Sequence, residues 1–423
     1  MKLSVFWTDQ YPRPDDLPTG KLPAEADVAI VGSGYTGLNA ALALGKAGLK
    51  AVVLEQETIG WGASSRNGSM LTPGLKADLE DIERWYGREK TLELWQWSVE
   101  AVHYVAEVIR DEGIACDFQM NGQVYLASKP SHAGGIRDYG ELLKTRFDYD
   151  DVRWVSPDEL RTEIGSRSFH GALIHELGAR LHPAKYTFGL ARAAARYGAS
   201  LVEHARVKKI ASLQPGFLLE TARGRIKAQE VLLATGGYTT NLVPKARQGI
   251  FPVGSYIIVT EPLPIALQKE LSPKDRVFYT SNIFLNYFCL TPDGRMLLGG
   301  RENLSTRLDL ERSARDLHGR MLEFFPQLEG VPLTHSWNGR LGVTFDQMPH
   351  VGQADGIYYA YGYSGHGITI GSYLGKEVGE LLAGIRQTSV FLDINHPRTV
   401  FARLDRVYLP FVSQYFKFRD AIS

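Results

Sequence analysis

The stretch that decides the fold is Gly32-Ser33-Gly34-Tyr35-Thr36-Gly37, which has the pattern G-x-G-x-x-G. It follows an apolar run at 28–31 and precedes a stretch from Leu38 to Gly48 with apolar residues at helical spacing. A second apolar run, 51–54, comes next. Strand, glycine turn, helix and strand in this order predict a βαβ unit that opens a doubly wound parallel sheet.

Each glycine of this turn has a different task in such a unit. Gly32 makes the tight turn, Gly34 lets the backbone approach a pyrophosphate, and Gly37 lets the helix lie close to the strand. The helix N-terminus adds free N–H groups and partial positive charge for phosphate. Glu55 ends the second strand, where its carboxylate can accept a hydrogen bond from a ribose hydroxyl. The pattern therefore predicts a dinucleotide site.

Two further segments are rich in small residues. Gly60-Trp61-Gly62-Ala63-Ser64-Ser65-Arg66-Asn67-Gly68-Ser69 follows the second strand, and its hydroxyls and arginine can bind phosphate or ring polar atoms. A capped loop that leads into a helix is the alternative interpretation of this segment. Gly362-Tyr363-Ser364-Gly365-His366-Gly367 precedes a helix expected over 368–382, whose N-terminal amides would face developing negative charge. For His366 a purely structural role is the alternative.

The composition is that of an ordinary globular protein. Of the 423 residues 44% are hydrophobic and 22% charged, and 47 basic residues balance 47 acidic ones. Disordered and collagen-like chains are therefore excluded, and no overall attraction to nucleic acid or anionic membranes is expected. With only Cys116 and Cys289, no disulfide scaffold or metal site is expected. The chain has no run typical of a signal peptide or a transmembrane segment, which favours a cytoplasmic enzyme.

The patterns along the chain predict an α/β protein with two interleaved domains. Apolar strands and helical stretches belong to a discontinuous nucleotide-binding domain, whereas residues 249–300 are β-rich and indicate an antiparallel sheet in a second domain. The expected division is a nucleotide-binding domain over 26–78, 151–245 and 336–390, a second domain over 79–150 and 246–335, an extended N-terminal arm over 1–25, and a C-terminal segment over 391–423.

Taken together, these motifs resemble the D-amino-acid oxidase superfamily of FAD-dependent amine and amino-acid oxidoreductases. The segment at 60–68 is most similar to the gamma-glutamylputrescine oxidase-like branch. The likeness covers nearly the whole chain, because Trp7, the glycine turn, and the runs 234–237, 337–352 and 364–367 occur in the family's order. It implies a discontinuous Rossmann-like FAD-binding domain of the GR2 type beside an α+β substrate domain with a mainly antiparallel sheet.

The resemblance also implies a set of site residues. Those expected to bind FAD are Gly32, Gly34, Tyr35, Thr36, Gly37, Glu55, Gln56, Gly62, Ala63, Ser64, Arg66, Asn67, Gly68, Ser69, Val207, Ala234, Thr235, Gly236, Arg340, Gly365, His366, Gly367, Ile368 and Thr369. Catalytic candidates are His366, Tyr256 and Arg340. Candidates for the substrate cavity are Tyr256, Phe284, Tyr287, Phe288 and Trp337, although aromatic residues in strands are also typical of a core. Arg301 and Arg340 are candidates for binding a substrate carboxylate, although each is also typical of a structural or surface arginine.

The chain departs from its relatives in the run Tyr-Phe-x-Leu-Thr-Pro-Asp-Gly, where Cys289 stands in place of a frequent arginine. Whether Cys289 changes the substrate class is left open. The cysteine that binds FAD covalently in some sarcosine-oxidase relatives aligns near Asn286 instead, so FAD is expected to be non-covalent. No lysine lies between Gln248 and Glu261, which leaves no candidate there for activating oxygen.

The activity implied is oxidation of an amine or amino acid by hydride transfer to flavin N5, giving an imine that water hydrolyses, with oxygen as acceptor. Two alternatives remain open: a dehydrogenase that passes electrons to a quinone or carrier, and a flavin-binding protein without turnover. The expected partners are a small amine or amino acid and an electron acceptor, not nucleic acid. The individual substrate and the oligomeric state are left open.

Overall fold

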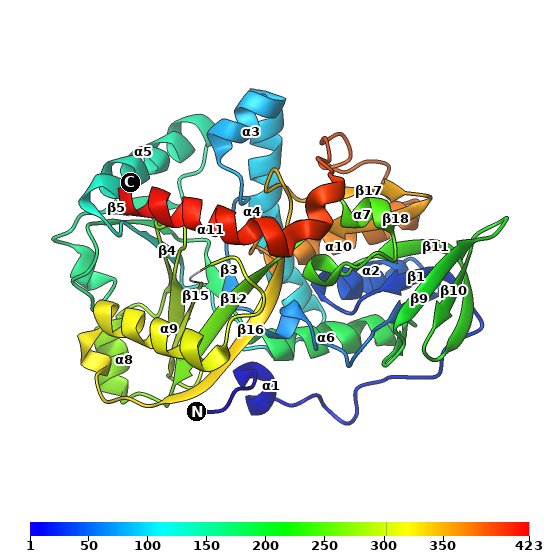
Figure 1. The fold of residues 1–423 in the computed structure, drawn as a ribbon, viewed down its shortest axis with the longest axis horizontal. Helices are drawn as coiled ribbons and strands as arrows, with labels where there is room; N and C mark the ends of the chain where they lie inside the picture. Colours follow the sequence, from blue (N-terminus) through cyan, green and yellow to red (C-terminus); the bar gives the residue numbers. More distant parts are fainter. Residues whose placement is uncertain (302, 423) are drawn as a thin grey trace.

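The computed structural model describes residues 1–301 and 303–422 and contains two large sheets with helices around them (Figure 1). In the first sheet, β1 pairs in parallel with β2 and β11, β2 pairs with β8, and β11 pairs with β18. This is the doubly wound parallel arrangement that the glycine turn predicted. The strands of the first sheet are β1 (Glu25–Val31), β2 (Ala51–Leu54), β8 (Ser200–Val202), β9 (Val207–Ser212), β10 (Phe217–Thr221), β11 (Gly224–Leu233), β17 (His350–Ala354) and β18 (Ile357–Tyr361).

The second sheet has the strand order β16-β12-β15-β14-β13-β4-β6-β5. All of its neighbouring strands pair antiparallel except β4 and β13, so the expected antiparallel character is confirmed. Its strands are β4 (Gln123–Leu126), β5 (Val152–Val155), β6 (Ala172–His175), β12 (Phe251–Thr260), β13 (Val277–Thr280), β14 (Tyr287–Leu290), β15 (Met296–Gly300) and β16 (Leu333–Val343). Two short strands, β3 (Met70–Leu71) and β7 (Ala179–Arg180), pair with each other.

Eleven α-helices surround the sheets in the described part of the chain. None of these helices combines the length and the apolar character that crossing a bilayer requires. They are α1 (Phe6–Gln10), α2 (Tyr35–Lys46), α3 (Leu79–Tyr86), α4 (Arg88–Asp111), α5 (Pro130–Phe147), α6 (Pro183–Arg196), α7 (Pro244–Arg247), α8 (Ile265–Leu271), α9 (Leu310–Phe324), α10 (Thr369–Leu382) and α11 (Asp405–Ile422).

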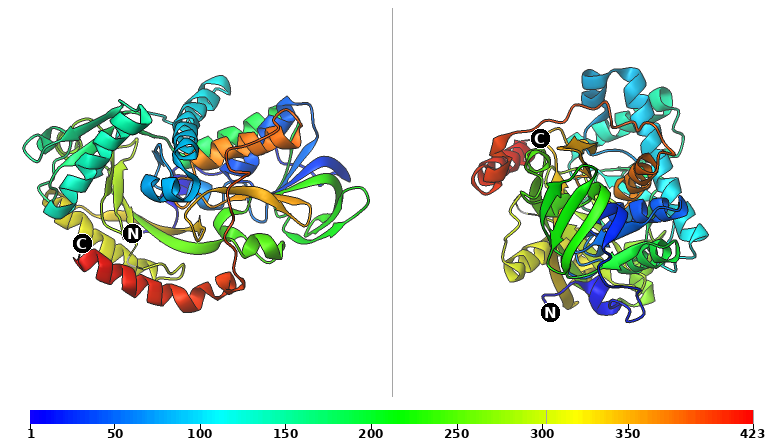
Figure 2. Two further views of the ribbon diagram at one scale, coloured as in Figure 1. Left: turned by 90° about the horizontal axis from the view of Figure 1, so that it is seen from above. Right: turned by 90° about the vertical axis from the view of Figure 1, so that its right-hand side faces the viewer.

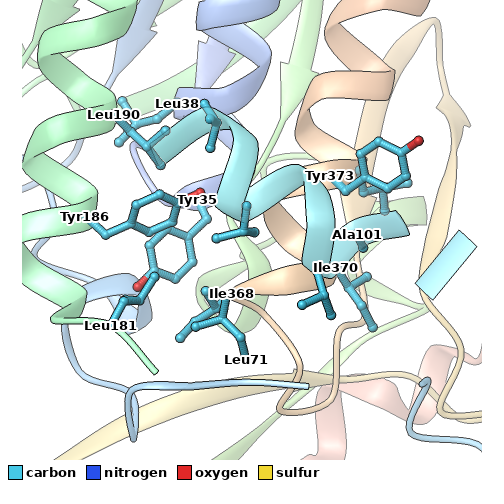
Figure 3. Packing of buried hydrophobic residues seen from close by; sticks show 14 of the residues in the cluster. Tyr35, Leu38, Leu71, Ala101, Leu181, Tyr186, Leu190, Ile368, Ile370 and Tyr373 are labelled. Atoms are coloured by element: carbon cyan, nitrogen blue, oxygen red, sulfur yellow. The ribbon is translucent and has the colours of Figure 1, made fainter. Parts of the chain in front are cut away.

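Helices α2 and α10 lie against each other with almost no side chain between them. A Cβ atom at Gly375 would lie 2.4 Å from the carbonyl oxygen of Thr36, and one at Gly379 would lie 2.8 Å from that of Ala40. Only glycine therefore permits this approach of the two backbones. Around the pair, a buried cluster joins α2, α4, α6 and α10, and Figure 3 shows its side chains, among them Leu38, Ala101, Tyr186, Leu190 and Ile370.

Strand pairing corrects the expected domain boundaries in two places. β5 and β6 fall within 151–245, assigned to the nucleotide-binding domain, yet β5 pairs with β6 and β6 pairs with β4 in the second sheet. Most of β16 falls within 336–390, yet it pairs with β12 along its length. Conversely, α4 from 79–150 packs against α10 of the first domain. Short apolar strands look alike in sequence, because their partners lie far away along the chain.

The sequence predicts an extended N-terminal arm over residues 1–25, but the structure contains a short helix in this arm. Phe6 and Trp7 begin the helix α1, and both side chains are buried. The indole Nε1 of Trp7 donates to the carbonyl of Asn67 at 2.9 Å, and the ring packs edge-on against His182 with centroids 4.9 Å apart. The arm is therefore part of the core and supports the segment 60–69.

Replacing Trp7 by Ala should lower the free energy of unfolding by about 3–5 kcal/mol, because it removes a fully buried ring and an indole hydrogen bond. Equilibrium unfolding in urea measures this change. The control is Trp85→Ala on α3, since the Trp85 side chain is 46% exposed. Equal stabilities for the two variants would contradict a core role for the arm.

Candidate active site

A cavity of about 1430 Å³ is lined by residues from both sheets. One part lies beside the glycine turn and Glu55, and another lies beside His366 and Arg301. All of the residues expected to bind FAD line this cavity except Gly37, Ser69 and Thr369. The structure thus gathers segments that are more than 300 residues apart in sequence, while their contacts with FAD remain a prediction.

The three exceptions have structural tasks. A Cβ atom at Gly37 would lie 2.0 Å from the carbonyl oxygen of Gly32, so this glycine serves close packing rather than a ligand. The hydroxyl of Ser69 donates to the carbonyl of Leu181, and that of Thr369 donates to the carbonyl of Thr72 at 3.3 Å. Their side chains therefore hold the walls of the cavity.

The first glycine turn is held by Glu55 at the end of β2. Its Oε2 accepts from the backbone N–H of Ser33 at 3.0 Å and from the Ser33 hydroxyl at 2.6 Å, and its Oε1 accepts from the backbone of Glu57. Gly32 adopts a φ of +108°, which favours glycine. Both lone pairs of Oε2 are thus used, whereas Oε1 retains one. Glu55 can thus fix the turn and still accept from a ribose hydroxyl.

Tyr35 and Asn67 join this turn to the second glycine-rich segment. The backbone N–H of Tyr35 donates to Ser64 Oγ at 3.0 Å, and its hydroxyl donates to the Ser64 carbonyl. Asn67 Nδ2 donates to the Tyr35 hydroxyl at 3.0 Å, and burial raises the pKa of Tyr35. These hydrogen bonds hold the second glycine-rich segment against the first turn, so that both segments form one wall of the cavity.

Arg66 and Arg340 lie near each other in the wall of the same cavity, and neither has a carboxylate partner in residues 1–301 and 303–422. Arg66 lies over the Trp61 ring at 4.6 Å and donates from Nε to the Trp61 carbonyl at 2.7 Å. Arg340 lies over the Tyr238 ring at 5.4 Å. Desolvation lowers the pKa of Arg66, and Arg340 lowers it further. Arg66 is half-buried and Arg340 is exposed, and two neighbouring cations of this kind suit a ligand that brings negative charge, as the diphosphate of FAD does.

The third glycine-rich segment meets the first turn through side chains. The hydroxyls of Thr36 and Tyr363 lie 2.7 Å apart. Gly365 has a φ of +117°, and a Cβ atom there would meet no protein atom within 4 Å. His366 Nδ1 is buried and has no hydrogen-bond partner within the described chain. Open space, an unpaired ring nitrogen and the start of α10 fit the flavin ring of FAD.

Burial, with a smaller contribution from the neighbouring Lys76, lowers the pKa of His366 to about 4. The imidazole is therefore neutral at pH 7 and acts as a dipole rather than as a charge.

The structure corrects most of the expected substrate-side aromatic residues. Tyr256 is buried in the second core, where its hydroxyl donates to the Ser305 carbonyl at 3.0 Å, so its expected catalytic position is wrong. Alternation along β12 turns Ser255 to the cavity instead, where its hydroxyl lies 2.9 Å from that of Tyr287. Of the proposed aromatic residues only Tyr287 lines the cavity.

The other three serve the core. Phe288 stacks on Phe278 with ring centroids 5.2 Å apart, and Phe284 packs against Phe416 of α11. Trp337 is buried and donates from Nε1 to the carbonyl of Arg66 at 2.9 Å.

Two further cations, Lys76 and Arg301, line the cavity, and Lys76 lies near His366. Desolvation lowers the pKa of both Lys76 and Arg301, and Arg301 also lowers the pKa of Lys76. Neither forms an ion pair with the carboxylates of the described residues. Arg301 was a candidate from the sequence, whereas Lys76 was missed because no motif surrounds it. Tyr125 and Tyr279, whose rings stack 4.5 Å apart in the same cavity, were missed for the same reason.

Gly34→Val should give a folded protein that has largely lost FAD, because the new side chain enters the cavity wall. A Cβ atom at Gly34 would already lie 3.0 Å from Ser64 Oγ. The ratio of flavin to protein after purification measures the effect. Gly134→Val on α5 is the matched control, since a Cβ atom there meets nothing within 4 Å. Normal FAD content in the Gly34 variant would contradict the assigned site.

Cys289 should not bind FAD covalently. Its side chain is buried, burial raises the pKa of its thiol to about 12, and its Sγ faces the carbonyl of Gly68 at 3.9 Å. The thiolate that would form such a bond is therefore scarce. Acid precipitation should leave the flavin in the supernatant, and Cys289→Ser should keep the same FAD content. Flavin retained in the pellet of the unmodified protein and lost from that of Cys289→Ser would overturn this prediction.

Comparisons with known proteins agree with this geometry. The chain is 33% identical over 403 residues to gamma-glutamylputrescine oxidoreductase of Escherichia coli (strain K12), covering 94% of this chain and 93% of that protein. It is 31% identical to the probable oxidoreductase OrdL of Haemophilus influenzae, covering 93% and 92% of the two chains. The structure of glycine oxidase from Geobacillus kaustophilus superposes with a TM-score of 0.77 at 22% identity, covering 89% of this chain and all of that one.

The model of the DAO family, described as FAD dependent oxidoreductase, matches residues 27–381. This match includes the glycine turn, Arg66, Arg340 and the start of α10. The chain belongs to the DAO family of FAD-dependent oxidoreductases.

Proposed function

We propose that this protein oxidises the C–N bond of an amine or amino acid that also carries an anionic group. The observation that carries the proposal is the placement of Lys76 and Arg301 in the wall of the cavity, where neither forms an ion pair with a carboxylate of residues 1–301 and 303–422. Support also comes from the relatives, since one is named gamma-glutamylputrescine oxidoreductase and a fold neighbour is a glycine oxidase. The imine formed would hydrolyse to an aldehyde or keto product and an amine or ammonia.

FAD supplies the two-electron oxidant when it is bound. The chain's share is to bind the substrate, to set its charge and to limit water. The guanidinium of Arg301 and the ammonium of Lys76 can bind a carboxylate, and the fork of arginine suits a bidentate contact. The rings of Tyr125, Tyr279 and Tyr287 form an aromatic wall in the same cavity.

The site also favours a neutral amine nitrogen. An aliphatic ammonium has a pKa near 10, and its nitrogen has no free lone pair to assist oxidation at the neighbouring carbon. Desolvation and the nearby cations Lys76 and Arg301 both disfavour a further positive charge, so the bound amine loses its proton more easily. His366 is neutral at pH 7 because its pKa lies near 4, so it adds no net charge beside the amine.

Oxygen is the proposed acceptor, with a quinone or carrier as the alternative that the experiment below separates. A cytoplasmic location is part of the proposal. It is supported by Cys116 and Cys289, which are both free and buried, as is usual in a reducing compartment.

Lys76→Met and Arg301→Met should each raise KM about tenfold to hundredfold for an amine that carries a carboxylate, because each removes a charge-assisted hydrogen bond. Neither should change KM much for an amine of similar length without that group. Steady-state kinetics with both substrates measures the difference. Lys21→Met, at an exposed lysine that does not line the cavity, is the control. Equal effects on the two substrates would contradict the proposed carboxylate contact.

The activity itself is tested with a panel of γ-glutamylputrescine, putrescine, glycine and D- and L-amino acids. We expect a carbonyl product from at least one of them, with hydrogen peroxide formed in stoichiometric amount when oxygen is the acceptor. If product forms only with an added quinone or dye, the enzyme is a dehydrogenase rather than an oxidase. No product from any amine with either acceptor would refute the proposed function.

A further inference from the structure

An exposed apolar stripe runs along the C-terminal helix α11 and the short 3-10 helix (Val400–Leu404) that precedes it. Seven large hydrophobic side chains between residues 400 and 418 are exposed, out of nineteen on the surface of the described residues. The views agree that α11, drawn in red, lies along the outside of the molecule (Figures 1 and 2). We name this stripe the α11 face, and it consists of Val400, Phe401, Leu404, Val407, Phe411, Tyr415 and Phe418.

The inner side of α11 is packed, which fixes the outward direction of the stripe. Leu409 is buried in a cluster with Val253 and Leu304, and the Ser413 hydroxyl accepts from the backbone N–H of Leu304 at 3.0 Å. The stripe positions on the helix recur every three or four residues, which places them together on the opposite side. Phe411 is 75% exposed and Phe418 is 62% exposed. A contiguous apolar surface of this kind marks an interaction site.

Among the described residues, the charged side chains beside the α11 face that form no ion pair are all basic. Arg403, Arg406, Lys417 and Arg419 are exposed and form no ion pair with the carboxylates of the described residues. The two nearby acids are engaged elsewhere in the fold. Asp405 pairs with Arg247 at 3.1 Å, and the Asp420 carboxylate accepts from the backbone N–H groups of Ile283 and Phe284. The chain has no net charge as a whole, yet this face is locally basic.

The four basic side chains beside the α11 face help to decide whether a second copy of the chain or a lipid surface covers this face. In a dimer through this face, two sets of four unpaired cations would be brought together, which costs energy. An anionic lipid surface instead offers negative charge to the cations and an apolar boundary to the phenylalanine rings, as interfacial helices with basic and aromatic residues require. Charge complementarity therefore favours lipid.

We propose that the α11 face binds peripherally to membranes rich in anionic lipid, with α11 lying in the plane of the surface and Phe411 and Phe418 inserted at its boundary. None of the seven residues lines the catalytic cavity. The membrane contact is thus separate from the proposed amine oxidation, and either can fail without the other.

Co-sedimentation with vesicles tests this proposal on the FAD-loaded protein. Vesicles of phosphatidylglycerol and phosphatidylcholine should retain the protein, vesicles of phosphatidylcholine alone should retain much less, and added salt should weaken the binding. Arg403→Gln with Arg406→Gln should lower the partition constant about 25-fold, at about fivefold per basic residue. Phe411→Ser with Phe418→Ser should lower it at least tenfold.

Ile265→Ser is the matched control, because Ile265 on α8 is 70% exposed and lies outside the face. It should bind vesicles like the unmodified protein, and every variant should keep its FAD content. Absence of binding to anionic vesicles, or equal binding by all variants, would overturn the proposal. So would a dimer, detected by sedimentation velocity, that Phe411→Ser with Phe418→Ser dissociates, since the face would then join two copies of this chain.

Discussion

The site depends on the contact between the backbones of α2 and α10. Both helices begin at a glycine-rich turn, and glycine at 375 and 379 lets α10 approach the carbonyl groups of Thr36 and Ala40. The same contact brings Thr36 within 2.7 Å of the Tyr363 hydroxyl. Two helix N-termini and their free amides therefore border one cavity, although they come from opposite ends of the chain. A larger residue at 375 or 379 would force the two helices apart.

Electrostatics divides this cavity into two regions. Arg66 and Arg340 lie beside the glycine-rich segments, where the diphosphate of FAD can neutralise them, while Lys76 and Arg301 lie on the proposed substrate side. Arg66 and Arg301 are partly buried and have no carboxylate partner in the described residues, so ligands that supply negative charge would stabilise them. The diphosphate of FAD is the partner we propose for Arg66, and an anionic group on the substrate is the partner we propose for Arg301.

The fold around the glycine turn could be predicted from local motifs, because strand, turn and helix fix the turn and Glu55 within 25 residues. The substrate side could not be predicted so well. A shift of one residue along β12 separates the buried Tyr256 from Ser255 in the cavity, and the sequence does not show which face turns inward. Lys76 reaches the cavity from a loop without a motif. β5 and β6 join the second sheet through partners that are distant in sequence.

The most direct test of the central claim is to mix the FAD-loaded protein with an amine substrate in the absence of oxygen and to follow the flavin absorbance. We expect a saturable loss of the oxidised flavin spectrum, at a rate that rises about tenfold per pH unit until the amine is neutral. The pKa of His366 near 4 should add no inflection between pH 6 and 9. Bound FAD that stays oxidised with every amine and amino acid of the panel would contradict the proposed oxidation of an amine by this protein.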